Sequence, residues 1–212
     1  FVGGCVRNYI KNIKVDDIDI ATIFSPEEIK DKFKNKKIKV IETGIEHGSV
    51  TLLNGNFKFE VTTLRKDINT DGRHADVLFS EDWREDSNRR DFTINAIYLD
   101  ISGKIFDPQE GVDDLKNCNV KFIGDPVKRI EEDYLRIIRF IRFALEYESK
   151  VEDKTIEAIK LSLNGIKRIS KERILTELFR ILSVKNFIKL NNHKDLKDIF
   201  FSIFPEFKYF KR

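Results

Sequence analysis

The dipeptide Asn54-Gly55 constrains the fold of this chain more than any other feature. It lies between two segments of alternating apolar and polar residues, 48–53 and 58–64. Asn-Gly favours the left-handed backbone that a tight turn between antiparallel strands requires, so the sequence predicts a β-hairpin here. Residues 15–22 and 37–43 are also predicted as strands, and Phe1-Val2 as the end of another. The first half of the chain therefore predicts a small β-sheet.

Two carboxylates stand two residues apart, Asp17 and Asp19, in the predicted strand VDDIDIAT. Alternate side chains of a strand leave the same face, so both are expected to project together. Carboxylates this close repel unless a cation lies between them, and Mg²⁺ prefers hard oxygen ligands. The pair therefore predicts a magnesium site, with an acidic strand end as the alternative. Glu60, on the returning hairpin strand, is either a surface residue or a third carboxylate from the neighbouring strand.

A glycine pair, Gly3 and Gly4, precedes a short predicted helix at the start of the chain. Glycines let backbone N–H groups approach a phosphate at a helix start, and Arg7 would add positive charge. A plain tight turn would have the same sequence. The pair gains significance because the predicted carboxylate strand follows it.

A polar stretch follows the hairpin, residues 65–75, without periodicity, and we predict a mobile loop there. Residues 80–88 are predicted as a short helix. Arg89, Arg90 and Asp91 then lead into residues 92–96, which are predicted as a buried strand. Two arginines and an aspartate at such a point can hold phosphate and ribose, whereas an isolated Arg-Arg-Asp would be a surface ion pair.

The second half of the chain is predicted to be helical. Residues 120–123 are predicted as a last strand, and Asp125-Pro126 caps a long helix that extends to Tyr147. Further helices are expected at 152–163, at 170–182 and from Asp195. The predicted fold class is α+β: a small mixed sheet with flanking helices, followed by an all-helical extension. We expect domains at 1–124, 125–182 and 183–212.

The two halves of the chain also differ in net charge. Residues 150–212 contain 15 basic and 8 acidic residues, a net charge of +7, and residues 1–149 contain 24 basic and 28 acidic residues, a net charge of −4. An acidic first part suits metal ions and a basic second part attracts a polyanion, although a solvated lysine-rich surface has the same composition.

The number of cysteines and the hydropathy of the sequence indicate the kind of cellular compartment that suits this chain. Only Cys5 and Cys118 are present, far apart, which suits a reducing compartment better than a disulfide scaffold. Neither a secretory signal nor a membrane-spanning segment is predicted, so we expect no membrane partner and no secretion. The chain contains no methionine, and we interpret it as a fragment or a processed form.

Within the predicted long helix, Asp133, Arg136, Arg139 and Arg142 recur every three residues, so neighbours in the series share a face. An amphipathic helix with a solvated basic stripe is the simple interpretation. A further one follows from chemistry, because arginine only donates hydrogen bonds and an ionised aspartate only accepts them. Cytosine and adenine both present an acceptor beside an amino donor, whereas uracil and guanine present the reverse. One Arg–Asp pair can therefore select C and A without a template.

The motifs GGCVRN, DDIDIAT, TGIEHGSVTLL, FEVTTLR, DGRHA, RRDFTINA, EDYLRIIRFIRFA and RISKERILTEL together resemble those of class II tRNA nucleotidyltransferases, the CCA-adding enzymes of bacteria and organelles. The resemblance covers residues 1–182, in the family's order. It implies a nucleotidyltransferase head, a helical neck and the start of a body domain. It also implies a tRNA 3′ end, CTP and ATP as partners, Mg²⁺ as cofactor, and a bacterial cytoplasm or an organelle as location.

The resemblance places roles on individual residues. It implies that Gly3, Gly4 and Arg7 contact the triphosphate, that Asp17 and Asp19 bind two Mg²⁺ ions, and that Glu60 is the third carboxylate. Arg90 and Asp91 would contact phosphates and sugar. Asp133 and Arg136 would read the base, with Arg139 and Arg142 continuing the nucleotide-binding stripe. The tRNA 3′-hydroxyl would then attack the α-phosphate of CTP or ATP.

Two departures and several alternatives remain. The family usually has an aspartate where this chain has Asn8, and its chains are longer. Bacterial poly(A) polymerases share most of these motifs but carry an arginine-rich strand in place of TGIEHGSVTLL. An enzyme that adds only A is a further alternative. The polar stretch 65–75 argues against an enzyme that adds only CC. A catalytically silent RNA-binding protein is the distant alternative.

Overall fold

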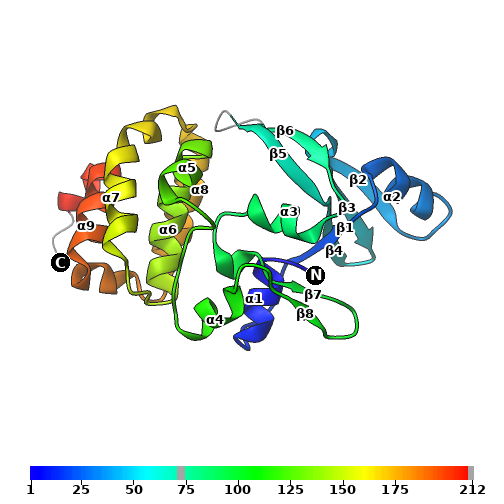
Figure 1. Cartoon of the computed structure of the whole chain (residues 1–212), viewed down its shortest axis with the longest axis horizontal. Helices are drawn as coiled ribbons and strands as arrows, with labels where there is room; N and C mark the ends of the chain where they lie inside the picture. Colours follow the sequence, from blue (N-terminus) through cyan, green and yellow to red (C-terminus); the bar gives the residue numbers. More distant parts are fainter. Residues whose placement is uncertain (71–74, 210–212) are drawn as a thin grey trace. The chain divides into compact units, whose positions relative to one another are not determined.

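The computed structural model describes residues 1–70 and 75–209. The chain forms two compact units (Figure 1). Of the described residues, the first unit contains 1–69 and 75–115, and the second contains Thr70 and 116–209. Strands and short helices make up the first unit, and the second is helical. The predicted α+β class is confirmed, and the domain boundaries at 124 and 182 stay predictions. Among the described residues, no helix is both long and apolar enough to span a bilayer.

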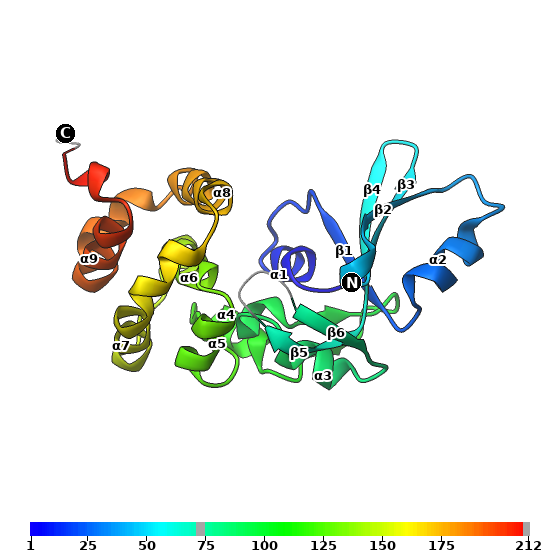
Figure 2. The same ribbon diagram turned by 90° about the horizontal axis from the view of Figure 1, so that it is seen from above.

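A four-stranded mixed sheet forms the centre of the first unit, in the order β1-β4-β3-β2. Its strands are β1 (Ile18–Thr22), β2 (Lys39–Gly44), β3 (Ser49–Asn54) and β4 (Phe57–Thr63). Strands β3 and β4 form the predicted antiparallel hairpin, visible in Figure 2, and Gly55 has the positive φ of 58° that its turn requires. Strand β1 pairs with β4 in parallel.

The two faces of this sheet differ in character. One face carries Val50, Leu52 and Val61, which pack with Ile29 of helix α2 (Pro26–Phe33) into a buried apolar cluster. Helix α2 begins with the predicted capping box between Ser25 and Glu28. The other face is polar, because register places Asp19 opposite Glu60 and Glu60 opposite Thr51. The alternation of β-strands thus delivers carboxylates and hydroxyls to one face.

The start of the chain lies between the sheet and a second small sheet. Val2 donates a backbone hydrogen bond to Asp19 at 3.0 Å, and Phe1 pairs with Leu99. This confirms Phe1-Val2 as an extended segment. The other elements of the first unit are η1 (Ile45–His47), α1 (Gly4–Ile10), α3 (Trp83–Asn88), η2 (Thr93–Asn95), β7 (Tyr98–Leu99), β8 (Ile105–Phe106) and α4 (Gly111–Lys116).

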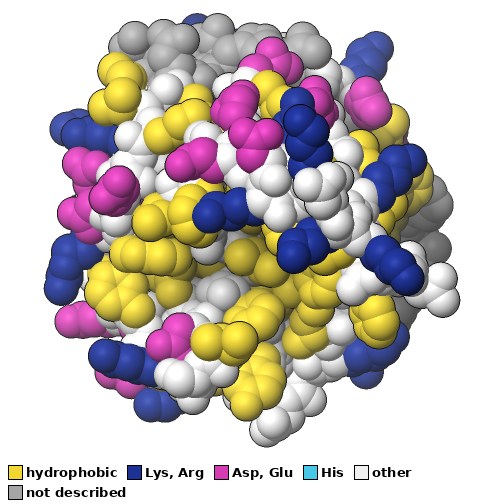
Figure 3. Space-filling view, turned by 90° about the vertical axis from the view of Figure 1, so that its right-hand side faces the viewer, with side chains coloured by type: hydrophobic (Ala, Val, Ile, Leu, Met, Phe, Trp, Pro, Cys, Tyr) yellow, Lys and Arg dark blue, Asp and Glu magenta, His cyan; other side chains and the backbone are white. Residues whose placement is uncertain are grey.

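Hydrophobic side chains gather in a band across the face shown in Figure 3, bordered by charged residues. A pocket of about 500 Å³ in the first unit is lined mainly by apolar residues, among them Phe1, Tyr98, Ile101 and Phe106.

Two predictions for the first unit are wrong. Residues 65–75, predicted as a mobile loop, instead contain strand β5 (Arg65–Thr70) and the first residue of strand β6 (Ala75–Phe79), and the two strands pair with each other. Residues 71–74 lie outside the described residues. The sequence of β5, RKDINT, has one apolar residue, Ile68, so it offers no apolar alternation for a sequence pattern to detect. Residues 92–96, predicted as a strand, instead contain the 3₁₀ helix η2, although they are buried as expected.

The second unit is built from packed helices. They are α5 (Pro126–Glu132), α6 (Leu135–Glu146), α7 (Asp153–Ser162), η3 (Leu163–Arg168), α8 (Lys171–Leu182), η4 (Phe187–Asn192), α9 (Lys194–Ile203) and η5 (Pro205–Tyr209). Helix α6 packs against α8, and α5 packs against α7. Phe140 and Phe143 of α6 are almost fully buried, and Phe200 of α9 is at the centre of a group of aromatic rings.

The long helix predicted for residues 125–147 is broken at Asp133. Asp133 has an extended backbone, with φ −157° and ψ 104°, and its Oδ1 accepts a hydrogen bond from the Leu135 N–H at 3.1 Å. Aspartate competes in this way with the helical hydrogen bonds, which explains the break. Residues 120–123 are also not a strand: the N–H of Val120 donates to the Ser149 hydroxyl rather than to another strand.

We expect Gly165→Ala to destabilise the second unit by about 1–3 kcal/mol. A Cβ at Gly165 would lie 2.0 Å from Cε1 of the Tyr134 ring, so the ring or the backbone of η3 must move. Denaturant unfolding of the variant measures the loss. Gly44→Ala is the control, because its backbone is extended and its added Cβ would make only an ordinary 3.6 Å contact. Equal stability of the two variants would contradict the packing assigned to Tyr134.

Candidate active site

The predicted carboxylates gather at the β1–β4 pair. Asp19 lies in β1 with Glu60 opposite it in β4, so the two side chains leave the same face. Strand β1 begins at Ile18, so Asp17 lies just before the strand, where it is exposed. Glu60 accepts a hydrogen bond from Lys58 at 2.8 Å. Register therefore brings Glu60 beside Asp19, two residues after Asp17.

Electrostatics at Asp19 reflect this crowding of negative charge. Burial raises the pKa of Asp19, and the Glu60 and Asp17 carboxylates raise this pKa further, against the opposing effects of Arg90 and Lys58. A divalent cation would relieve both the repulsion and the desolvation. Within the described residues, no three His, Cys, Asp or Glu side chains are already arranged around a common metal position. The donor oxygens of Asp17 and Asp19 nonetheless fit Mg²⁺ by their chemistry.

Asp19→Asn is expected to raise the thermal midpoint of the metal-free protein by a few degrees, about 2–4 °C for each kcal/mol gained. Because the pKa of Asp19 is raised in the folded state, the wild type loses stability as the pH rises from the ordinary value of 3.8 through the raised value. The amide cannot ionise and avoids this loss. Thermal melts between pH 3 and pH 8 test it. A gain that is the same at every pH would contradict the electrostatic explanation.

The predicted phosphate-binding turn has the expected backbone at its first glycine. Gly3 has a φ of 72°, and its N–H donates to the Ile97 carbonyl at 3.2 Å. Arg7 differs from expectation: it is only 8% exposed, and its Nη1 donates to Oδ1 of Asn95. Asn8, where the resembled family has aspartate, lies near the Arg7 guanidinium at 3.5 Å. The turn thus holds Arg7 against the segment that follows Asp91.

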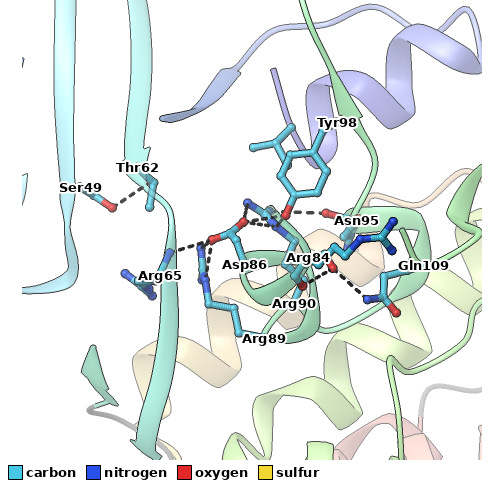
Figure 4. Close-up of polar contacts among 12 residues, drawn as sticks. Ser49, Thr62, Arg65, Arg84, Asp86, Arg89, Arg90, Asn95, Tyr98 and Gln109 are labelled. Carbon is cyan, nitrogen blue, oxygen red and sulfur yellow. Dashed lines mark hydrogen bonds and ion pairs between the residues drawn. The ribbon is translucent and has the colours of Figure 1, made fainter. Parts of the chain in front are cut away.

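That segment is organised by a residue that the sequence interpretation missed, Asp86 of α3 (Figure 4). Oδ2 of Asp86 accepts from Arg90 Nη2 at 3.1 Å and from the Tyr98 hydroxyl at 2.7 Å, and Oδ1 accepts from Arg89 Nε at 2.8 Å. Asp86 is 1% exposed. Its spacing of three and four residues from the two arginines, which suits one helical turn, was the available signal.

The pKa values of these groups follow from their contacts. Burial alone would raise the pKa of Asp86, but the guanidinium groups of Arg90 and Arg89 outweigh burial and hold the pKa below its usual value. Burial raises the pKa of the Tyr98 hydroxyl well above its usual range. Asp86 is therefore ionised and Tyr98 is protonated at neutral pH.

Asp91, which is partly buried, also belongs to this network. Its Oδ1 accepts from the Phe92 N–H and from Nδ2 of Asn95, both at 2.9 Å. Asn95 in turn accepts from Arg7. Asn95 therefore connects the glycine turn with the Arg-Arg-Asp motif.

In the second unit, Asp133 lies at the helix break and Arg136 lies in the first turn of α6. Oδ2 of Asp133 accepts from Nη2 of Arg173 in α8 at 2.7 Å. Nη1 of Arg136 donates to Glu132 at 2.6 Å and to the carbonyl of Arg129 at 2.7 Å. The two side chains of the predicted base-reading pair thus have separate partners, and Arg173 is one that the sequence interpretation missed.

Arg139 and Arg142 face helix α8. Nε of Arg142 lies 2.9 Å from Glu177, a buried carboxylate that also contacts Arg139 at 3.8 Å and Arg180 at 2.7 Å. Burial lowers the pKa of Arg142, and the charge of Arg139 lowers it further, while Glu177 opposes the shift. These contacts assign Arg142 a packing role between α6 and α8, and its predicted part in nucleotide binding stays a prediction.

The chain matches two family models. Residues 1–121 match the poly A polymerase head domain, and residues 150–210 match the family described as a probable RNA and SrmB-binding site of polymerase A. It is 45% identical over 184 residues to the mitochondrial CCA tRNA nucleotidyltransferase 1 of Homo sapiens, and 44% identical over 183 residues to the CCA-adding enzyme of Lactobacillus helveticus. Each alignment covers 85% of this chain, but only 42% and 45% of the respective relative.

Solved structures agree with these relatives. The CCA-adding enzyme of Bacillus stearothermophilus in complex with CTP superposes with a TM-score of 0.78 and 35% identity, over 89% of this chain and 45% of that one. A tRNA nucleotidyltransferase complexed with a primer tRNA and an incoming ATP analog has a TM-score of 0.75 at 26% identity, over 95% of this chain and 58% of that one. The chain thus spans about half the length of its relatives. Because the head-domain model matches more than half of its residues, this chain belongs to the poly A polymerase head domain family.

Proposed function

We propose that this chain is the catalytic part of a CCA-adding tRNA nucleotidyltransferase, which transfers C and A from CTP and ATP to the 3′ end of tRNA. The observation that carries the proposal is the carboxylate set at the β1–β4 pair, where Glu60 lies opposite Asp19 and Asp17 precedes the strand. The CCA-adding relatives and the solved complexes with CTP and with a primer tRNA support the choice of substrates.

Asp17 and Asp19 are the residues proposed to hold Mg²⁺, with Glu60 as the third carboxylate. Bound Mg²⁺ would favour the ionised tRNA 3′-hydroxyl and neutralise charge on the triphosphate. Arg90, together with the turn at Gly3 and Gly4, would bind the phosphates, and Asp91 would lie at the ribose. The 3′-hydroxyl would then attack the α-phosphate and displace pyrophosphate.

Asp133 and Arg136 are the residues proposed to read the base. An acceptor from Asp133 and donors from Arg136 complement the edges of cytosine and adenine, and would leave polar groups of uracil and guanine unpaired. In the free protein Arg173 holds Asp133, and Glu132 holds Arg136, so both side chains are ordered before a nucleotide arrives. The proposed location is a bacterial cytoplasm or an organelle, since the relatives are bacterial and mitochondrial.

Equilibrium binding of the four nucleoside triphosphates, in the presence of Mg²⁺, tests this proposal without requiring the remaining length of the relatives. CTP and ATP should bind at least tenfold more tightly than UTP and GTP. Equal affinities for the four nucleoside triphosphates, or no binding of any of them, would favour the alternative of a catalytically silent RNA-binding protein. The A-adding enzyme and the poly(A) polymerase, which share the head-domain family, are separated from the proposed enzyme by the products that they form.

A further inference from the structure

Asp86 is a buried ion whose role is not explained by its place in helix α3. It is 1% exposed, and a carboxylate so far removed from water is retained only where cations and hydrogen-bond donors surround it. Its neighbours meet this requirement, because Arg89, Arg90 and Tyr98 all donate to it. One negative charge here faces two guanidinium groups, so the cluster keeps a net positive charge.

The two oxygens of Asp86 hold different neighbours. Oδ1 accepts from Nε of Arg89 at 2.8 Å and from Nη2 of the same guanidinium at 2.7 Å. Oδ2 accepts from Nε of Arg90 at 3.2 Å and from its Nη2 at 3.1 Å. Each arginine is therefore held through two nitrogens, which fixes the plane of its guanidinium as well as its position.

Tyr98 of β7 completes the support. Its hydroxyl donates to Oδ2 of Asp86 at 2.7 Å and accepts from Nε of Arg90 at 3.2 Å. The Tyr98 ring also has the Arg90 guanidinium within 5.3 Å of its centroid and the Trp83 ring packed edge-on at 5.5 Å. Arg90 is thus supported by a carboxylate, a hydroxyl and an aromatic ring.

This support directs the third nitrogen of Arg90 toward the glycine turn. Nη1 of Arg90 lies 3.5 Å from the Asn95 carbonyl oxygen, and a Cβ built on Gly3 would lie 3.5 Å from the same nitrogen. The Arg90 guanidinium therefore lies beside the glycine turn, where its Nη1 is closest to Gly3 and to the Asn95 carbonyl.

We propose that Asp86 is a positioning residue for nucleotide binding: it orients the Arg90 guanidinium so that Nη1 faces the Gly3 turn, ready for the phosphates of a nucleoside triphosphate. This inference rests on the proposed function. Arginine loses considerable side-chain freedom when it binds a phosphate, and Asp86 removes that freedom before the ligand arrives. A merely structural ion pair would instead link α3 to β7 with no effect on ligand affinity.

A double-mutant cycle on CTP affinity separates the two roles. The variants are Asp86→Asn, Arg90→Ala and their combination, and the dissociation constant of CTP is measured with Mg²⁺ present. Asp86→Asn should weaken CTP binding about tenfold or more, and Arg90→Ala should do the same. If Asp86 acts through Arg90, the double variant should be within about twofold of Arg90→Ala alone. Asp82→Asn is the matched control, because Asp82 caps the same helix through the Arg84 N–H and should leave CTP affinity unchanged.

Tyr98→Phe extends the test if Asp86→Asn does not fold. It removes one donor to Asp86 and keeps the ring, and we expect a loss of about threefold in CTP affinity that disappears when Arg90 is already alanine. Unchanged CTP affinity in Asp86→Asn, or losses that multiply in the double variant, would overturn the inference. If the wild-type protein binds neither CTP nor ATP, the proposed function itself is wrong.

Discussion

Asp17→Asn is expected to lower the rate of nucleotide transfer to tRNA by about a thousandfold or more while the fold stays intact. Asp17 is exposed just before β1, so the amide disturbs no packing, but it removes one of the two charges proposed to hold Mg²⁺. The charge is needed because an amide oxygen is a far weaker partner for a divalent cation than a carboxylate. Incorporation of labelled CTP into a tRNA that lacks its 3′ CCA measures the rate.

Asp16→Asn provides a matched control one residue away. Asp16 is also exposed, and it forms a surface ion pair with Lys14 at 2.6 Å, so the same change in charge occurs outside the proposed site. A solvent-exposed ion pair of this kind contributes little to stability, so this variant should fold normally and its turnover should stay close to that of the wild type. Near-normal turnover of Asp17→Asn would refute the metal-binding role of Asp17. Equal losses of turnover in both variants would show that the loss comes from the change in local charge and not from a lost metal ligand.

Arg136→Ala is expected to reduce discrimination between the correct and incorrect nucleotides by about a hundredfold or more. In the proposed role, Arg136 would supply donors that match the acceptors of cytosine and adenine, and without those donors all four bases would meet a similar environment. The measurement is kcat/KM for each of the four nucleoside triphosphates. The ratio matters more than any single value, because Arg136 also donates to Glu132 and to the Arg129 carbonyl at the end of α5.

Arg180→Ala controls for the loss of a guanidinium from the second unit. Arg180 pairs with Glu177 at 2.7 Å, and more than half of its side chain is exposed. Its removal should leave nucleotide choice unchanged. If Arg136→Ala also leaves the ratios of kcat/KM between the four nucleoside triphosphates unchanged, the proposal that Asp133 and Arg136 read the base is wrong, even if overall activity falls.

Local chemistry explains the parts of the fold that could be predicted from the sequence. The hairpin at Asn54-Gly55 and the capping box of Ser25 and Glu28 each depend on residues only a few positions apart. The shared face of Asp19 and Glu60 needed one further step, the pairing of β1 with β4. The sequence left that pairing open, since Glu60 could be either a surface residue or a third carboxylate from a neighbouring strand, and the structure shows β4 beside β1.

Features that depend on distant partners were missed. An aspartate in a short polar helix, such as Asp86, is expected at the surface. Asp86 is buried because it contacts Tyr98, which lies twelve positions away in the sequence. Asp133 interrupts a helical pattern because its side chain bonds to Leu135 and to Arg173 of another helix. Strand β5 has the sequence RKDINT, in which Ile68 is the one apolar residue, so no apolar period marks it. In each case the sequence shows the residue types but not the contact that decides the structure.

The length of the products formed on a tRNA that lacks its 3′ CCA is the most direct measure of the proposed function. The protein is incubated with Mg²⁺ and with CTP alone, ATP alone, or both, and the products are separated at single-nucleotide resolution. We predict addition of two C residues from CTP alone, and addition of CCA followed by a stop when both nucleotides are present. A long run of A from ATP alone, or addition of A only to a tRNA that already ends in CC, would contradict the proposal.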